Sequence, residues 1–195
     1  MPCEPIASAN AYIGAEPIAD ALRADDPDTA RRELSDWLQR NTDRLKTEEI
    51  ARLSIEQGIL AAHRHVLAPL ALFALLPGPT GPLLYRLTER LSWSWARREN
   101  IEFGAFGRFA RRMYEWLDWV PVRMTAATFA IVGDFEDAVH CWRTQAARWP
   151  EQAAGILLAS GAGALGVKLG APLFELGEVA DRPELGMGND ADVDL

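Results

Sequence analysis

The sequence predicts an all-α integral membrane protein with soluble amphipathic helices at its N-terminal side. Residues 66–85 run for twenty positions without a charged side chain, and residues 153–174, rich in glycine and alanine, contain one charge, Lys168. Both stretches reach the length of about 20 apolar residues that a helix needs to cross a bilayer core. Before them, residues 16–64 are charged and show the 3.6-residue periodicity of amphipathic helices.

The N-terminal region, residues 1–64, is expected to form soluble helices. Asp26 stands directly before Pro27, a pairing typical of a helix start. The apolar residues that follow share one helix face: Ala30, Leu34, Trp37 and Leu38. A second helix is predicted to begin at Thr47, because the two glutamates after it place negative charge in the first turn.

The apolar stretch 66–85 carries "PGPTGP" at its midpoint. Proline removes backbone donors and glycine loosens the backbone, so a broken or re-entrant hairpin is expected instead of one straight helix. Residues 1–64 contain eight Lys or Arg and residues 86–118 contain seven. The positive-inside tendency then places both flanks on the cytoplasmic side, which a hairpin satisfies and a single crossing does not.

The rest of the chain is read as three further segments of one domain, residues 1–195. Residues 119–133 are a short apolar segment whose Arg123 should face protein, water or a ligand, because a charge facing lipid is costly. Residues 153–174 are predicted to be a membrane helix, and residues 175–195 an acidic tail that is disordered at its end.

Small residues recur at four-residue steps in the predicted membrane helix. They are Gly155, Ala159 and Gly163, followed by Gly166 and Gly170 in G-x-x-x-G spacing. Membrane helices approach closely on such surfaces, so a homo-oligomer mediated by this helix is possible. The lipid bilayer is the other expected partner. Tryptophans near the edges of the apolar segments resemble an aromatic belt: Trp93, Trp95, Trp116, Trp119 and Trp149.

Composition excludes several classes of function. The net charge of −8 argues against general binding of nucleic acid. Cys3 and Cys141 match no zinc spacing, and His63 and His65 are interpreted as surface polar residues, so no metal site is predicted. The acidic cluster from Asp134 is expected to cap the next helix. A large soluble helical bundle with very apolar core helices remains an alternative at this point.

Several short motifs occur together in a fixed order along the chain. They are "RNTDRL", "EIARLSIE", "APL", "LPGPTGPLLYR", "VPVRMTA" and "AGALGVKLGAP". In this order and spacing they resemble the membrane family of adenosylcobinamide-phosphate synthases of cobalamin biosynthesis, CobD or CbiB, with its beta-lactamase-regulatory relative AmpE. The resemblance covers roughly residues 20–172. Members of that family are longer and begin with membrane helices, so the chain is expected to be N-terminally incomplete.

The resemblance implies a protein of the bacterial inner membrane and a corrinoid intermediate as a partner. The family's synthases join aminopropanol or its phosphate to a carboxylate of cobyric acid. The site residues that the resemblance implies are Glu56, Arg112, Glu115 and Arg123. Neither the resemblance nor the residues identify a cofactor.

The chain departs from the family's acidic motif, Glu-x-x-Ala-Glu-Asn-x-x-Asp. Glu56 matches its first position, but the second Glu, the Asn and the Asp correspond to Leu60, Ala61 and Arg64. A later acidic pair falls on Tyr114 and Glu115, and the Asn before the family's final Ala-Gly stretch falls on Ala153. Two hypotheses follow: an enzyme of cobalamin assembly, or a degenerate, non-catalytic relative that acts like AmpE as a membrane regulator or sensor.

Overall fold

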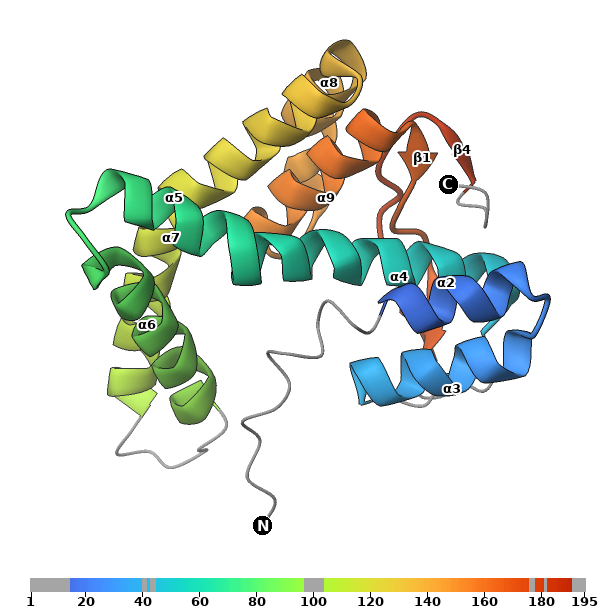
Figure 1. Cartoon of the computed structure of the whole chain (residues 1–195), viewed down its shortest axis with the longest axis horizontal. Coiled ribbons are helices and arrows are strands. Elements are labelled where there is room, and N and C mark those ends of the chain that lie inside the picture. Colours follow the sequence, from blue (N-terminus) through green and yellow to red (C-terminus); the bar gives the residue numbers. More distant parts are fainter. Residues whose placement is uncertain are drawn as a thin grey trace.

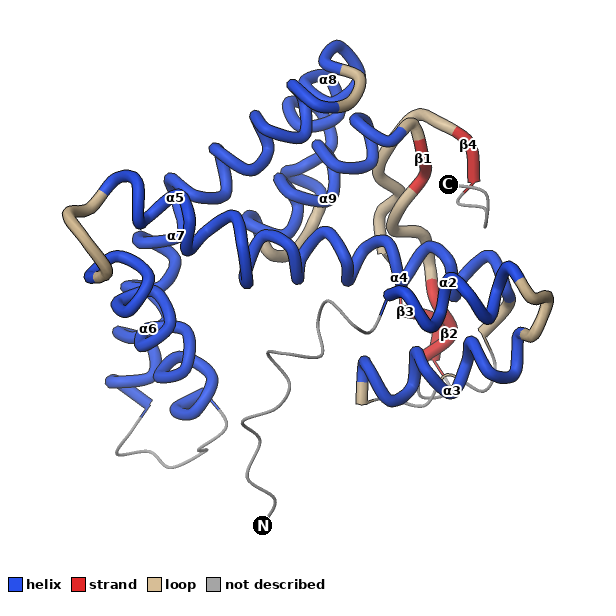
Figure 2. The backbone as a smooth tube through the Cα atoms, in the orientation of Figure 1, coloured by secondary structure: helices blue, strands red, loops and turns tan. Residues whose placement is uncertain are grey.

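The computed structural model describes residues 15–39, 42, 45–96, 104–175, 178–180 and 182–190. The described chain is mostly helical, with short strands near its C-terminal end (Figure 2). The helices are α2 (Ala15–Arg23), α3 (Pro27–Leu38), α4 (Thr47–Ala62), α5 (Ala68–Leu75), α6 (Thr80–Ala96), α7 (Gly104–Val132), α8 (Phe135–Gln145) and α9 (Gln152–Leu165). A π-turn, η1 (His63–Leu67), and a 3-10 turn, η2 (Ala146–Arg148), join some of them. The strands are β1 (Val167–Lys168), β2 (Leu173–Glu175), β3 (Glu178–Ala180) and β4 (Asn189–Asp190).

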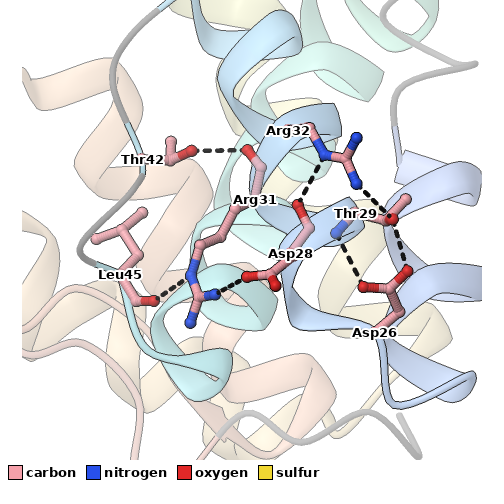
Figure 3. Close-up of polar contacts among 7 residues, drawn as sticks. All are labelled: Asp26, Asp28, Thr29, Arg31, Arg32, Thr42 and Leu45. Atoms are coloured by element: carbon pink, nitrogen blue, oxygen red, sulfur yellow. Dashed lines mark hydrogen bonds and ion pairs between the residues drawn. The ribbon is translucent and has the colours of Figure 1, made fainter.

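The first helices form as the sequence predicts. Asp26 caps α3, and its carboxylate accepts hydrogen bonds from the Thr29 N–H at 3.1 Å and the Thr29 hydroxyl at 2.6 Å (Figure 3). These bonds, the hydroxyl first, lower the pKa of Asp26. Arg31 donates to the Leu45 carbonyl at 3.0 Å, and Thr42 donates to the Arg31 carbonyl at 2.6 Å. The segment that leads into α4 is therefore tied to α3.

The predicted apolar face of α3 is confirmed. Ala30 and Leu34 are buried, while Trp37 and Leu38 pack at the edge of the same cluster. Side chains of α2, of the segment before α4 and of the start of α4 complete this small core: Ile18, Ala21, Leu22, Leu45, Ile50, Ala51 and Leu53. Helix α4 does begin at Thr47, although its cap is Lys46, whose N–H donates to the Glu49 carboxylate at 2.8 Å.

Helices α4 and α5 are joined by η1 into one rod that crosses the molecule (Figure 1). In η1 the Ala68 N–H donates to the His63 carbonyl, five residues back, so the helix continues with one widened turn. Among the described residues this rod, Thr47–Leu75, is long and apolar enough to cross a membrane. The boundary expected between a soluble helix ending at residue 64 and an apolar segment from residue 66 is therefore absent.

The predicted break in the apolar stretch 66–85 is confirmed. Helix α5 ends at Leu75, where the next residue adopts an extended backbone, and α6 begins at Thr80. Gly78 has a φ of +72°, a conformation that glycine adopts without steric cost. Helix α6 then packs against α5 and α7, at the opposite end of the rod from α2 and α3 (Figure 1).

The main core lies where α9 packs between α7, α8 and the rod. Helix α9 is almost wholly buried, with Leu157, Leu158 and Ala159 at most 2% exposed. Asp134 caps α8 by accepting a hydrogen bond from the Asp137 N–H at 3.0 Å, which confirms the capping role predicted for the acidic cluster. The short apolar segment predicted at 119–133 is the C-terminal half of α7.

The prediction of a membrane helix over 153–174 is wrong. Helix α9 ends at Leu165 because Gly166 takes the left-handed conformation with a φ of +66°, and short strands follow it. A helix of 14 residues rises about 21 Å, which is shorter than a bilayer core of about 30 Å. Gly166 and Gly170 therefore do not form a helix face.

The small residues of α9 pack against other elements of the same chain. A β-carbon on Gly155 would meet the carbonyl of Ala146, and one on Gly163 would lie 2.5 Å from the carbonyl oxygen of Asp137. The stripe thus allows α9 to approach α8 and η2 closely, as the spacing indicates, but inside one molecule. It is not free for a second copy, and the basis for the predicted helix-mediated oligomer is lost.

Replacing Gly163 by alanine should lower the free energy of unfolding by about 1–3 kcal/mol, because the added methyl group would push α8 and α9 apart. The matched control is Gly58→Ala in α4, where a β-carbon meets no described atom within 4 Å. That change should raise stability by about 0.5–1 kcal/mol, since alanine loses less conformational entropy in a helix. Denaturant unfolding followed by circular dichroism measures both. Equal stability of Gly163→Ala and the unaltered chain would contradict the close approach.

The described part of the acidic tail packs onto the core. Leu169 and Leu185 are both 0% exposed and exchange backbone hydrogen bonds of 2.8 Å in each direction. The Gly186 N–H donates to the Gln145 side chain at 2.6 Å, and β4 pairs with β1 in parallel. The expectation of disorder concerned the end of the tail, and residues 191–195 lie outside the described residues. The side chains of Trp93 and Trp95 also lie outside them.

Candidate functional site

A cleft of about 620 Å³ opens between α7 and the segment that begins α9. From α7 it is lined by Arg111, Tyr114, Glu115, Trp116, Asp118, Trp119, Val122 and Arg123. Residues 150–153 and Ile156 line the opposite wall. The cleft combines two tryptophans, two arginines and three carboxylates, and concave sites with convergent polar groups are the usual places for ligands.

The floor of the cleft is Asp118, a carboxylate that is 4% exposed. Its Oδ1 accepts hydrogen bonds from Nε2 of His63 at 3.0 Å and from the Tyr85 hydroxyl at 3.1 Å. Tyr85 in turn lies 3.0 Å from the Tyr114 hydroxyl, and Nδ1 of His63 lies 2.9 Å from the Thr125 hydroxyl. The rod, α6 and α7 each contribute to this network.

The tyrosines of the network act as hydrogen-bond donors. Burial, and after it the negative charge of Asp118, raises the pKa of both Tyr85 and Tyr114. Both hydroxyls therefore keep their protons at neutral pH. Tyr114 can donate to Tyr85 while Tyr85 donates to Asp118, and His63 donates from the other side. The donors of the network converge on one carboxylate that lines the cleft.

The rim of the cleft carries cationic groups beside tryptophan. The Arg123 guanidinium lies 3.8 Å from the centre of the Trp119 ring and donates to the Trp119 carbonyl at 2.8 Å. These two contacts hold the half-buried charge in place. Arg111 pairs with Glu115 at 3.1 Å, one helical turn apart and exposed, which is a weak interaction.

Glu56 lies outside the cleft and holds the C-terminal segment. One of its oxygens accepts the Gly170 N–H at 2.8 Å, and the other pairs with Arg182. The Arg182 guanidinium also lies 4.9 Å from the centre of the Trp149 ring. Both carboxylate oxygens of a residue that is 2% exposed are therefore engaged in a structural contact.

The predicted site residues divide into two groups. Glu115 and Arg123 line the cleft, whereas Glu56 and Arg112 do not, and Arg112 is exposed on α7. The four predicted site residues do not lie together in the structure. The two predicted carboxylates, Glu56 and Glu115, are also apart, since only Glu115 lines the cleft. No three His, Cys, Asp or Glu side chains within the described ranges are grouped so as to hold a metal ion.

Sequence reasoning missed the network at the floor of the cleft. The interpretation of His63 as a surface polar residue is wrong: it is 1% exposed, because it continues the buried face of α4 and contacts Asp118 and Thr125 of α7. A signal was available in the spacing of Tyr114, Asp118 and Thr125, which places three polar groups on one face of the helix. Such a face is stable in a protein core only when its polar groups find partners.

These features define a mostly helical protein with one rod that could cross a membrane and a cleft with a buried polar floor. The chain belongs to the CobD/Cbib protein family, whose sequence model matches residues 6–194. No solved structure matches the chain.

Named relatives share much of the chain. A cobalamin biosynthesis protein CobD of Stutzerimonas stutzeri is 41% identical over 89% of this chain and 56% of its own length. Proteins of the same name from Chromobacterium violaceum and Mycobacterium tuberculosis are 37% and 34% identical, over 55% and 56% of their lengths. The chain thus spans little more than half the length of these relatives.

Proposed function

We propose that this chain is a membrane-associated protein of cobalamin biosynthesis that binds a corrinoid intermediate at the α7–α9 cleft but does not complete the amide ligation of the family's synthases. The observation that carries the proposal is the state of Glu56. It is the position of the family's acidic motif that this sequence retains, and both of its oxygens are engaged by Gly170 and Arg182. Each of its oxygens already has a protein partner, and at 2% exposure the carboxylate is shielded from a substrate in the cleft.

The other positions of the acidic motif support the same conclusion. Leu60 is a partly buried side chain that packs against the main core. Ala61 has no functional group, and Arg64 carries the opposite charge to the Asp that the resemblance implies. Oxygen ligands for a metal–phosphate centre cannot be supplied by these side chains. Ligation chemistry would have to rely on other groups.

The cleft itself supports ligand binding. A corrinoid intermediate offers a large apolar ring edge and carboxylate or amide side groups. Trp116 is 78% exposed and Trp119 is 57% exposed, so both present apolar surface to a ligand, while Arg123 offers a cation. Stacked guanidinium groups of this kind bind carboxylates and phosphates well.

The rod supports the association with the inner membrane. Within its most apolar stretch only 28% is buried, so the described residues leave most of that surface uncovered. Leu70 is 62% exposed and Phe73 is 55% exposed on α5. A core helix of a soluble bundle would be mostly buried, whereas a lipid-facing helix leaves such side chains outside.

A growth test combined with a binding test examines the proposal. The chain, extended by the remaining length of the Stutzerimonas relative, should not restore growth to a strain that lacks the cobalamin synthase and is supplied with cobyric acid. Loss of a single electrostatic group in such sites typically lowers the catalytic rate about 100-fold, and here three motif positions differ. The same protein should bind cobyric acid in equilibrium dialysis, followed by the visible absorbance of the corrinoid.

The controls separate loss of chemistry from loss of folding. The intact Stutzerimonas protein should restore growth. Arg123→Ala should weaken the binding of cobyric acid about 10-fold or more, whereas Arg143→Ala, on the exposed face of α8, should leave it unchanged. Growth rescue that disappears in Arg123→Ala would show that the chain is a synthase after all. Absence of corrinoid binding would refute the proposed role.

A further inference from the structure

Helix α7 carries an apolar stripe on its outer side. Six large side chains of the stripe are 38% to 78% exposed: Phe109, Met113, Trp116, Val120, Met124 and Ile131. At 100° per residue these positions, together with the exposed Ala127, fall within an arc of about 80°. Asp118, Val122 and Thr125, which are buried, lie on the opposite face of the helix. Helix α7 therefore has one face inside the molecule and a second, apolar face that the described residues leave largely uncovered.

The surroundings of this stripe favour a protein partner over lipid. Helix α7 has 29 residues, yet within the described ranges the rod, Thr47–Leu75, is the helix both long and apolar enough to cross a membrane. Arg112 and Arg123 border the stripe, within about 40° of its edge around the helix. Charges in contact with lipid tails are costly, whereas a narrow apolar stripe bordered by charges is typical of the seam between two helices.

The positions of the stripe are symmetric about Val120, with residues four, seven and eleven positions away on both sides. When two copies of α7 pack antiparallel about a two-fold axis at Val120, residues at equal distances on opposite sides meet. The pairs are Trp116 with Met124, Met113 with Ala127, and Phe109 with Ile131. Pro121 lies next to the axis but is buried, so its ring does not interrupt the stripe. The stripe is thus complementary to itself over about 33 Å, as the contact between identical surfaces in a two-fold dimer requires.

The charges at the two ends of the stripe are complementary as well. Near the N-terminal end of α7 the exposed charges are Arg108, Arg111 and Arg112. Directly after its C-terminal end they are Asp134 and Glu136. Antiparallel pairing brings the basic end of one copy beside the acidic end of the other, whereas parallel pairing would bring like charges together. Charge and symmetry therefore indicate the same partner, a second copy of this chain.

We propose that two copies of this chain associate through the apolar stripes of their α7 helices, antiparallel about a two-fold axis at Val120. The association does not depend on the proposed binding of a corrinoid. Trp116 belongs to the stripe and also lines the cleft, so the second copy lies at the mouth of the cleft. There Met124 of the second copy packs on Trp116 and narrows the entrance.

Disulfide cross-linking of the full chain in intact expressing cells, with copper phenanthroline as the oxidant, tests the register. All variants carry Cys3→Ser, and Cys141 is 0% exposed, so the introduced cysteine is the accessible one. Val120→Cys should form a covalent dimer, because the two side chains meet at the axis. Met113→Cys and Ala127→Cys should each form about 10-fold less dimer alone, since identical positions then lie about 21 Å apart along the helix. The two variants expressed together should cross-link to each other.

The outcomes against the proposal are equally specific. Absence of a dimer from Val120→Cys would overturn it, and so would Met113→Cys that cross-links to itself, which indicates parallel helices. The matched control is His140→Cys, exposed on α8 away from the stripe, which should form no dimer. As much dimer from this control as from Val120→Cys would mean that the cross-link reports random collision, and the proposal would be wrong.

Light scattering of the purified chain in detergent measures the strength of the dimer. Val120→Arg places two like charges at the axis and should weaken association about 30-fold or more, with unchanged thermal unfolding because the side chain is 38% exposed. Arg108→Glu combined with Arg112→Glu should weaken it about 10-fold, and adding Glu136→Arg should restore part of the loss. An unaltered chain that is monomeric and gives no cross-link at position 120 would show that lipid or another protein covers the stripe, which would refute the dimer.

Discussion

Replacing Glu56 by alanine should lower the free energy of unfolding by about 3–5 kcal/mol, the range for breaking a buried ion pair. The change would leave the Gly170 N–H without its acceptor and Arg182 without its counter-charge. It would also release the segment after α9 from the rod, because Glu56 joins residues more than a hundred positions apart in the sequence. Denaturant unfolding followed by circular dichroism provides the measurement.

Two further variants identify the cause. Glu56→Gln keeps an acceptor for Gly170 but loses the charge opposite Arg182, so it should cost less than alanine. Glu115→Ala removes an exposed partner of Arg111, and it should change stability by less than about 1 kcal/mol. If the alanine variants at positions 56 and 115 have the same small effect, the buried pair does not anchor the C-terminal segment. Restored stability in Glu56→Gln would assign the effect to the backbone contact.

Exchanging Leu70 and Phe73 together for aspartate should move the protein from the membrane fraction to the soluble or aggregated fraction after alkaline carbonate extraction. A carboxylate at the centre of a membrane helix costs about 2.5–3.5 kcal/mol. Leu70 and Phe73 lie in the last two turns of the rod, where the cost is smaller, so the two carboxylates together should shift the distribution by about 10-fold or more. Both side chains are more than half exposed on α5, so the change should disturb internal packing little. Immunoblotting of the fractions gives the result.

Leu165→Asp is the matched control. Leu165 is 51% exposed at the end of α9, a helix too short to cross a bilayer, so this variant should stay in the membrane fraction. Release of the unaltered protein by carbonate would refute the association with the membrane. Retention of the Leu70 and Phe73 double variant would show that another segment anchors the chain.

Local signals in the sequence predicted the elements that depend on near neighbours. The Asp26 and Asp134 caps, the apolar face of α3 and the break before Thr80 all formed as expected. Each depends on backbone geometry or on residues within one or two helical turns. The end of α9 was missed although Gly166 marks it, because the apolar run continues past that glycine. Apolar composition alone does not separate a buried helix from a membrane helix.

The candidate site was harder to predict because its partners come from distant positions. Arg123 lines the cleft, but Glu56 contacts a glycine and an arginine that no local pattern links to it. His63 and Asp118 lie 55 residues apart in the sequence. Their pairing depends on how the rod packs against α7, a tertiary arrangement that helical periodicity does not encode.

The widened turn η1 also changes the phase of the rod. Along α4 the buried positions advance by three or four residues, from Glu56 to Ile59 and then His63, but the next buried position is Ala68, a step of five. One extra residue rotates everything after it by about 100° relative to a regular helix. A regular helix of the same sequence, without the widened turn, would therefore turn Ala68 and Leu72 away from the face on which His63 lies. The α5–α6 contact and the His63 network could not then both form, which makes η1 the point where the register of the two ends of the rod is set.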